Sequence, residues 1–373
     1  MKHSINALFI VLIALVRPAF SQTTSDSTYI TKNEVKQLFN GSSLTAQLFM
    51  GYQQILEGTS NKSQFVLKRG YLNFRKSINN YLSGRITPDI TVDNEGDGKG
   101  DIEMRLKYCY MEFKGIGNRF FTEPSFVFGM VYTPWLEFEE KINRFRVQGT
   151  AFLDREGIST SGDFGFTGSF LIGGKVDADY QNKVNNRYAG RFGSVAIGLY
   201  NGGGYHALEE NNNKVFEARI SIRPFPSMVS GLQFSYTGAY GKGNTVMEPL
   251  WELSSGCVSY ESERIVITGQ YYTGIGNFAG SMVDANGKPY QNWGMSYYSE
   301  VRFYKKKVSL IGRFDRQVIH LNPGEGRSFR SIVGLAYHLD GSNKVLLDYD
   351  HIAYSGLSKE GVATLELMVE LAF

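Results

Sequence analysis

The sequence predicts an all-β protein: a closed, sixteen-stranded antiparallel β-barrel that crosses a membrane. Three observations favour this fold class. Apolar and polar residues alternate with period two in many segments. Glycine (42 residues) and aromatic residues (14%) are abundant while proline is scarce (9 residues), a composition typical of strands and turns. The connections between the segments also alternate between long and short.

The N-terminal residues 1–21 are expected to be a signal peptide. Lys2 and His3 precede an apolar run from Ile5 to Val16, and small residues follow up to Ser21, which is the pattern a signal peptidase requires. The run is too short to span a bilayer as a helix, which needs about 20 apolar residues. Residues 22–41 are expected to form a short periplasmic lead-in.

Residues 42–373 are expected to be one outer-membrane barrel domain, because no linker or change of composition interrupts them. Lys2 and Arg17 leave with the signal, so 37 basic residues face 36 acidic ones. Binding to nucleic acid needs a clustered basic surface. We therefore expect no nucleic-acid partner.

Sixteen strand-like segments follow one another from Leu44 onward. They lie at 44–55, 64–76, 81–93, 101–114, 125–134, 162–173, 187–200, 214–224, 230–241, 248–260, 263–274, 292–305, 307–320, 327–339, 344–355 and 361–373. Most are long enough for a tilted membrane-spanning strand, which needs about 9–11 residues. In 214–224, for example, Phe216 and Ile220 fall on one face and Glu217 and Arg219 on the other.

The last segment, 361–373, shows the clearest alternation and stops on the aromatic Phe373. One apolar and one mostly polar face is typical of the closing strand of an outer-membrane barrel. Taken alone, it fits the edge strand of a soluble β-sandwich as well. Charges recur on one face of many other segments, however, and this indicates a water-filled lumen rather than a packed interior.

The connections support the barrel. The expected surface loops are long and polar; they lie at 56–63, 94–100, 135–161, 201–213, 275–291, 320–326 and 356–360. Several of the other connections are tight turns, although 115–124 and 174–186 are long for turns. Long loops outside and short turns inside are typical of transmembrane barrels, and an even strand number puts both chain ends in the periplasm.

Short motifs between Ile86 and Phe373 resemble those of a known family. The motifs are Phe128–Pro134 followed by Arg144–Arg146, Gly198–Gly202 and Ala218–Pro224. In this order they resemble the phosphate-selective porin family, whose members are sixteen-stranded and usually trimeric outer-membrane channels. The resemblance implies a homotrimer and an inward-folded third loop that narrows the lumen. Met130 and Tyr132 stand where the family often has a polar residue and a lysine that help to select anions.

The expected third loop, Trp135 to Ser161, contains the candidate pore constriction. Its charged residues are Glu137, Glu139, Glu140, Lys141, Arg144, Arg146 and Arg155, besides Asp154 and Glu156. Fixed charges of both signs at a constriction filter solutes by charge and size. We hypothesise that Arg144, Arg146 and Arg155 face acidic residues across the eyelet. The alternative is an ordinary solvated surface loop.

Basic residues also recur on the expected lumen face of the strands. The candidate wall residues are Arg85, Arg105, Arg219, Arg223, Arg302, Arg313 and Arg330. A guanidinium group binds phosphate and carboxylate groups well. Acidic residues share these faces, so we expect a mild anion preference.

The predicted function is passive diffusion of small hydrophilic solutes, including anions such as phosphate, without an enzymatic step, a cofactor or a metal. None of His206, His320, His338 and His351 has the serine two residues on that the barrel phospholipases have. The alternatives are a barrel enzyme of the lipase or protease type and a surface adhesin or structural barrel. Expected partners are outer-membrane lipid and lipopolysaccharide, and the barrel-assembly machinery through the strand that ends in Phe373.

Overall fold

The computed structural model describes residues 39–93 and 98–373. The chain divides into two compact units, Met1–Asn40 and Gly41–Phe373. The predicted signal peptide and nearly all of the predicted lead-in therefore lie outside the described residues. The second unit is the barrel.

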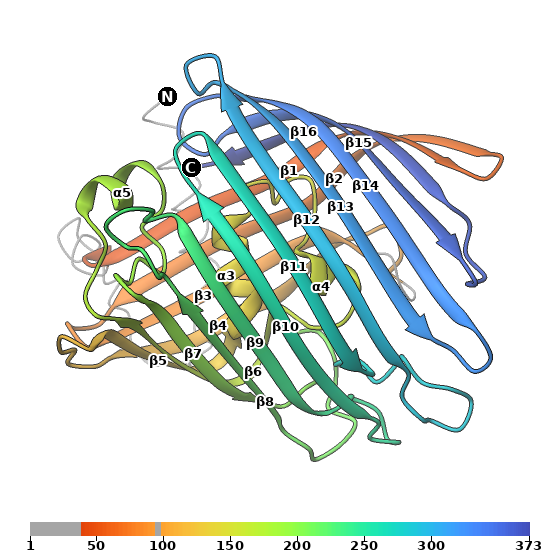
Figure 1. Cartoon of the computed structure of the whole chain (residues 1–373), viewed down its shortest axis with the longest axis horizontal. Helices are drawn as coiled ribbons and strands as arrows, with labels where there is room; N and C mark the ends of the chain where they lie inside the picture. Colours follow the sequence, from red (N-terminus) through yellow and green to blue (C-terminus); the bar gives the residue numbers. More distant parts are fainter. Residues whose placement is uncertain (1–38, 94–97) are drawn as a thin grey trace, which may run out of the picture. The chain divides into compact units, whose positions relative to one another are not determined.

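Sixteen strands form a closed barrel in which each strand pairs with its neighbours in the chain and β1 pairs with β16 (Figure 1). The strands are β1 Ser42–Glu57, β2 Ser60–Ser77, β3 Leu82–Val92, β4 Ile102–Lys114, β5 Phe121–Tyr132, β6 Gly162–Ile172, β7 Gly193–Tyr200, β8 Val215–Ile222, β9 Leu232–Lys242, β10 Leu250–Glu261, β11 Ile265–Ile275, β12 Gln291–Phe303, β13 Val308–His320, β14 Glu325–His338, β15 Lys344–Ser355 and β16 Val362–Ala372. The predicted sixteen-stranded antiparallel barrel is confirmed.

The described parts of the connections between strands contain three helices: α3 Pro134–Ile142, α4 Phe152–Arg155 and α5 Ala178–Lys183. Within residues 39–93 and 98–373, the helices are all too short or too polar to cross a membrane. We call the end of the barrel with the connections after odd-numbered strands the loop end. The opposite end, where β1 begins and β16 finishes, is the turn end.

The alternation of each strand decides which side chains face outward. On β16, Leu365 and Leu367 are 50% and 49% exposed on the outward face, whereas Glu366 and Glu370 are buried on the inward face. Large apolar side chains are exposed in the same way on the other strands. An apolar outward face and a polar inward face are what a barrel needs in a lipid bilayer.

Some predicted boundaries were wrong. Residues 56–63 were expected to be a surface loop, but β1 and β2 stay paired up to Glu57 and Ser60. Gly58, at φ +53°, makes the tight turn possible because glycine adopts positive φ without a steric penalty. β7 begins at Gly193 rather than at 187, because residues 173–192 fold as a separate connection that contains α5.

Two β-bulges each place an additional lysine in the lumen. Phe49 pairs with Arg69 and Met50 with Leu67, so Lys68 is an extra residue in β2. Likewise, Thr87 pairs with Tyr108 and Pro88 with Leu106, which leaves Lys107 as an extra residue in β4. A bulge lets two consecutive side chains point to the same face of a strand.

Candidate functional site

The third loop, residues 133–161 between β5 and β6, folds into the barrel (Figure 1). Its apolar residues Trp135, Phe138 and Phe152 are at most 2% exposed. They belong to one buried cluster with inward residues of the wall, including Trp251 and Ile311. Burying aromatic side chains of this size stabilises the inward position strongly. The loop is thus packed against the wall and is not a solvated surface loop.

Hydrogen bonds also hold the third loop at its base and at its tip. The Thr133 hydroxyl donates to the Thr160 carbonyl oxygen at 2.7 Å where the loop leaves and rejoins the strands. At the loop end of the barrel, Asn277 donates through Nδ2 to the Gly157 carbonyl oxygen at 3.0 Å. Near the turn end, Lys344 donates through Nζ to the Arg144 carbonyl oxygen at 3.1 Å.

The polar face of α3 carries Glu137, Glu140 and Lys141. Glu140 pairs with Arg146 at 2.9 Å and with the bulge residue Lys107 at 3.9 Å, while Glu137 pairs with Lys141 at 3.2 Å. Burial raises the pKa of Glu140, but Arg146 and Lys107 outweigh it and lower this pKa to about 2. Glu140 is therefore an anion that holds two cations in place.

Glu139 and Arg155 lie against the opposite wall. Arg313 is 3.7 Å from Glu139 and 3.0 Å from Asp315, and Arg155 is 3.4 Å from Asp315. Burial and the adjacent Arg313 lower the pKa of Arg155 to about 10 despite Asp315. Arg155 also donates to Gln148 Oε1 at 2.9 Å. Glu139 before the tip and Arg155 after it thus connect both halves of the third loop to β13.

Arg144 lies at the tip of the third loop, where a second inward connection meets it. This connection, residues 173–192, contains α5. Arg144 donates to the Val184 carbonyl oxygen at 3.1 Å and lies 3.9 Å from Glu261 at the end of β10. Asn185 donates to the Lys141 carbonyl oxygen at 3.1 Å and to Glu261 at 2.9 Å. The tip is therefore supported from the turn end of the barrel.

Arg219 and Arg223, proposed as wall residues, are each 1% exposed and do not line open lumen. Arg219 donates to the Pro134 carbonyl oxygen at 3.1 Å, and its guanidinium lies 4.3 Å from the Phe138 ring. The Arg223 guanidinium lies 5.0 Å from the Tyr180 ring, beneath α5. Both arginines anchor the inward connections.

The other predicted wall arginines pair along the strands. Arg85 donates to Asn73 at 2.7 Å and lies over the Tyr108 ring at 4.5 Å. The remaining pairs are Arg105 with Glu103 at 3.4 Å, Arg302 with Glu300 at 2.6 Å and Arg330 with Asp350 at 2.5 Å.

A cavity of about 390 Å³ separates the third loop from β1, β2, β14, β15 and β16. Five cationic side chains line it against two carboxylates: Lys68, Arg69, Arg146, Arg155 and Arg330 against Asp350 and Glu366. The partners of three of these cations, Asp89, Glu140 and Asp315, do not line the cavity. The cavity wall therefore carries an excess of positive charge.

Lys68 is a cation of the cavity that the period-two pattern does not predict. Its ammonium donates to the Gln148 carbonyl oxygen at 2.9 Å and pairs with Glu366. The bulge reverses its parity, so a strict period-two pattern places it outside. The sequence nevertheless contains evidence for the bulge. Lys68 and Arg69 are adjacent, so without a bulge one of the two cations would face lipid, at a cost of about 2–4 kcal/mol near the bilayer midplane.

Within the described part of the chain, no group of three His, Cys, Asp or Glu side chains is placed to hold a metal ion.

The comparisons with known proteins agree with the fold. No protein-family model matches the chain, and no curated protein matches it significantly. Solved structures do match. OprB of Pseudomonas putida has a TM-score of 0.58 and 11% sequence identity, over 95% of this chain and 100% of OprB. An anion-selective porin from Comamonas acidovorans has a TM-score of 0.57 and 7% identity, over 89% of this chain and 100% of that porin. OmpT of Vibrio cholerae, solved in a trimer form, has a TM-score of 0.57 and 12% identity, over 89% of this chain and 99% of OmpT.

The closed sixteen-stranded barrel with its apolar outward face defines the class: this chain is an outer-membrane β-barrel with the fold of the porins. At these identities the likeness extends to the fold alone. The phosphate-selective family stays a prediction.

Proposed function

We propose that the protein is an outer-membrane channel for passive diffusion of small hydrophilic solutes, with a preference for anions such as phosphate. The observation that carries this proposal is the cavity beside the third loop, with five cations against two carboxylates. A cation cluster in a narrow, low-dielectric passage concentrates anions and repels cations. The channel works without covalent chemistry, and the arginine forks suit phosphate and carboxylate groups.

The solute path runs along the side of the barrel that the third loop leaves free. Gln53 lines the cavity, and the half-buried Gln64, which donates to Gln53 at 3.1 Å, faces inward above it, toward the loop end. Asn73 and Arg85 face inward below it, toward the turn end. The charged cavity lies between these two polar regions and acts as the constriction.

The comparison with a porin that is itself anion-selective supports the proposed preference, and the trimer form of another similar barrel supports a homotrimer. Met130 and Tyr132 supply no cation, so we assign anion attraction to the bulge lysines and the loop arginines. Outer-membrane lipid and lipopolysaccharide are the proposed surroundings of the apolar face, and the assembly machinery is the proposed partner of β16.

Osmotic swelling of proteoliposomes tests the proposal with three solutes of similar size: glucose, gluconate and glucosamine. We expect gluconate to enter fastest and glucosamine slowest. Lys68→Gln combined with Arg146→Gln removes two of the cavity cations and should bring the gluconate rate close to that of glucose. Lys99→Gln, in an exposed loop, is the matched control. Faster entry of glucosamine would contradict the anion preference, and no swelling with any solute would contradict the channel.

A further inference from the structure

Arg316 is a cation on the outward face of the barrel. Its strand neighbours Asp315 and Gln317 point inward and are buried, so the alternation of β13 turns Arg316 outward. The guanidinium carbon lies 4.9 Å from the Trp293 ring and 5.3 Å from the Phe329 ring. The two rings hold the guanidinium between them.

Among the residues that the structure describes, Arg316 has no ion-pair partner. Among the described residues, none receives a hydrogen bond from its buried Nε, and no ion pair involves it. Glu325, on the adjacent strand β14, pairs with Arg327 at 2.8 Å and lies 3.2 Å from His320. Arg316 is thus fixed in position but lacks an anion.

Arg316 lies four residues before the loop-end terminus of β13 at His320. With a rise of about 3.3 Å per residue and the usual tilt, this is about 10 Å along the membrane normal. An unpaired charge on the lipid face costs about 2–4 kcal/mol at the bilayer midplane and less near the interface. An anionic headgroup of the outer leaflet would remove this cost.

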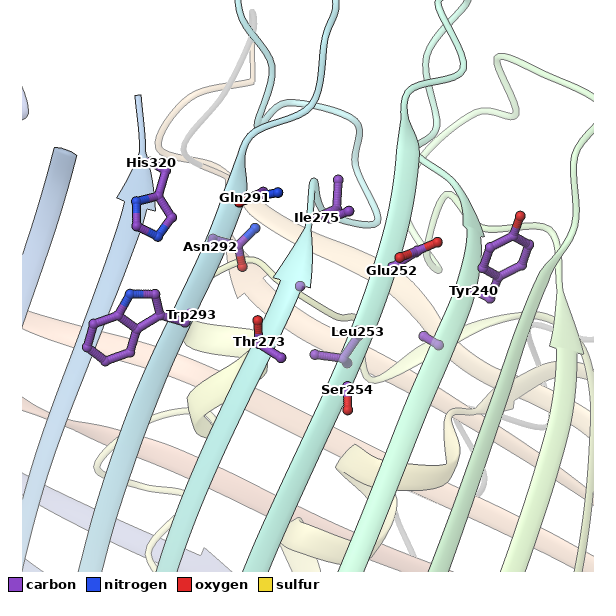
Figure 2. A pocket seen from close by; sticks show the side chains of 12 residues that line it. Tyr240, Glu252, Leu253, Ser254, Thr273, Ile275, Gln291, Asn292, Trp293 and His320 are labelled. Carbon is purple, nitrogen blue, oxygen red and sulfur yellow. The ribbon is translucent and has the colours of Figure 1, made fainter. Parts of the chain in front are cut away.

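A pocket of about 460 Å³ opens beside it on the same outward face. Figure 2 shows Glu252, Ser254 and Thr273 between the aromatic rings of Tyr240 and Trp293. Hydroxyl and carboxylate groups next to flat aromatic rings suit the hydroxyl-bearing faces of a sugar. Trp293 connects the pocket to Arg316, because it lines the pocket and its ring also lies 4.9 Å from the Arg316 guanidinium carbon.

We propose that Arg316, Trp293 and this pocket bind the phosphorylated saccharide headgroup of an outer-leaflet glycolipid. The phosphate accepts hydrogen bonds from the Arg316 guanidinium, and the sugar lies in the pocket between Tyr240 and Trp293. The aromatic clamp presets the guanidinium and so reduces the entropy lost on binding. This site lies outside the lumen and does not depend on the proposed conduction.

Native mass spectrometry of the full barrel in nonionic detergent tests the proposal. The probes are bisphosphorylated lipid A, the sugar-free anionic lipid dioleoylphosphatidylglycerol and zwitterionic dioleoylphosphatidylcholine. We expect the barrel to retain lipid A most strongly. Arg316→Gln should weaken lipid A binding about tenfold, and Trp293→Leu, which keeps the charge, should weaken it as well. Arg264→Gln removes an exposed cation at the turn end and should change nothing.

Heat-modifiable migration on gels shows first that each variant has folded. Equal binding of lipid A by the wild type and by both site variants would overturn the proposal. Equal affinity for lipid A and dioleoylphosphatidylglycerol would overturn the saccharide part of the site. Loss of oligomers in Arg316→Gln with unchanged lipid binding would also overturn it and assign Arg316 to an interface between copies of this chain.

Discussion

At the scale of single residues, most charges in the lumen are paired, but the cations line the cavity while most of their carboxylate partners do not. Glu140 holds Arg146 and Lys107, and Asp315 holds Arg155 and Arg313. The carboxylates lie behind their partners as seen from the cavity, so a passing solute meets mainly the cations. Ion selectivity should therefore respond to the acidic partners as strongly as to the cations themselves.

Glu140→Gln should strengthen the anion preference. The change removes the carboxylate that holds Arg146 and Lys107, which leaves two uncompensated cations beside the cavity. One unit charge at about 4 Å in water is worth about 1 kcal/mol, or roughly a fivefold change in the ratio of anion to cation permeability. Reversal potentials in a salt gradient measure this ratio, with the exposed Glu210→Gln as the control. An unchanged or lower ratio would contradict the arrangement.

Anion preference should also grow as the pH falls from 7 to 4. Burial raises the pKa of Glu139, Asp154 and Glu156, all in the third loop, so these carboxyls lose their negative charge before ordinary acids do. Glu140 stays ionised because its pKa is lowered to about 2, and the third loop therefore keeps its anchor. Reversal potentials across this pH range test the trend, and Glu156→Gln should reduce it. An anion preference that weakens as the pH is lowered would contradict the role given to these three carboxyl groups.

At the scale of elements, two connections enter the barrel and meet. The third loop descends from the loop end, and residues 173–192 support its tip from the turn end through Val184 and Asn185. The width of the constriction therefore depends on both connections.

Asn185→Ala should loosen the tip of the third loop. The change removes the two hydrogen bonds that Asn185 donates, to the Lys141 carbonyl oxygen and to Glu261, and the one that it accepts from the Arg187 amide. Loss of a buried hydrogen-bond partner costs about 1–3 kcal/mol. We expect more open-channel noise and a larger conductance in single-channel recordings. Gln181→Ala is the control, because Gln181 donates only to Val176 within the same connection. Identical recordings for the two variants would show that the second connection does not position the loop.

Much of this architecture follows from the alternation of residues such as those of β16, because membrane strands must separate lipid-facing from lumen-facing side chains. The bulges were missed because one extra residue reverses the parity of everything beyond it. Pro88, which cannot donate to the sheet, was a usable signal for the bulge at Lys107. The partners of the loop charges could not be predicted from the sequence. Arg155 and Asp315, for example, are 160 residues apart, and only the folded barrel brings them together.

At the scale of the whole molecule, the pairing of β1 with β16 closes the barrel. Ala46 N donates to the Phe373 carbonyl oxygen at 2.7 Å, and Phe373 N donates to the Ala46 carbonyl oxygen at 3.1 Å. These bonds complete the ladder at the turn end and leave no open edge there, as the bilayer requires.

Deletion of Phe373 should lower the amount of folded barrel in the outer membrane severalfold, because it removes both closing hydrogen bonds. Phe373→Leu keeps them and should assemble nearly as well. Heat-modifiable migration of membrane fractions distinguishes folded from unfolded chains and also reports the proposed homotrimer. Normal assembly of the deletion variant would contradict the importance of this closure.

The most direct test of an anion-preferring channel is planar-bilayer recording of the refolded protein under a salt gradient. We expect discrete conductance steps, a reversal potential on the anion side, reduction of the current by added phosphate, and a weaker preference in Lys68→Gln. Steps without selectivity would leave a general diffusion channel, whereas a cation-side reversal potential or the absence of steps would contradict the proposed function.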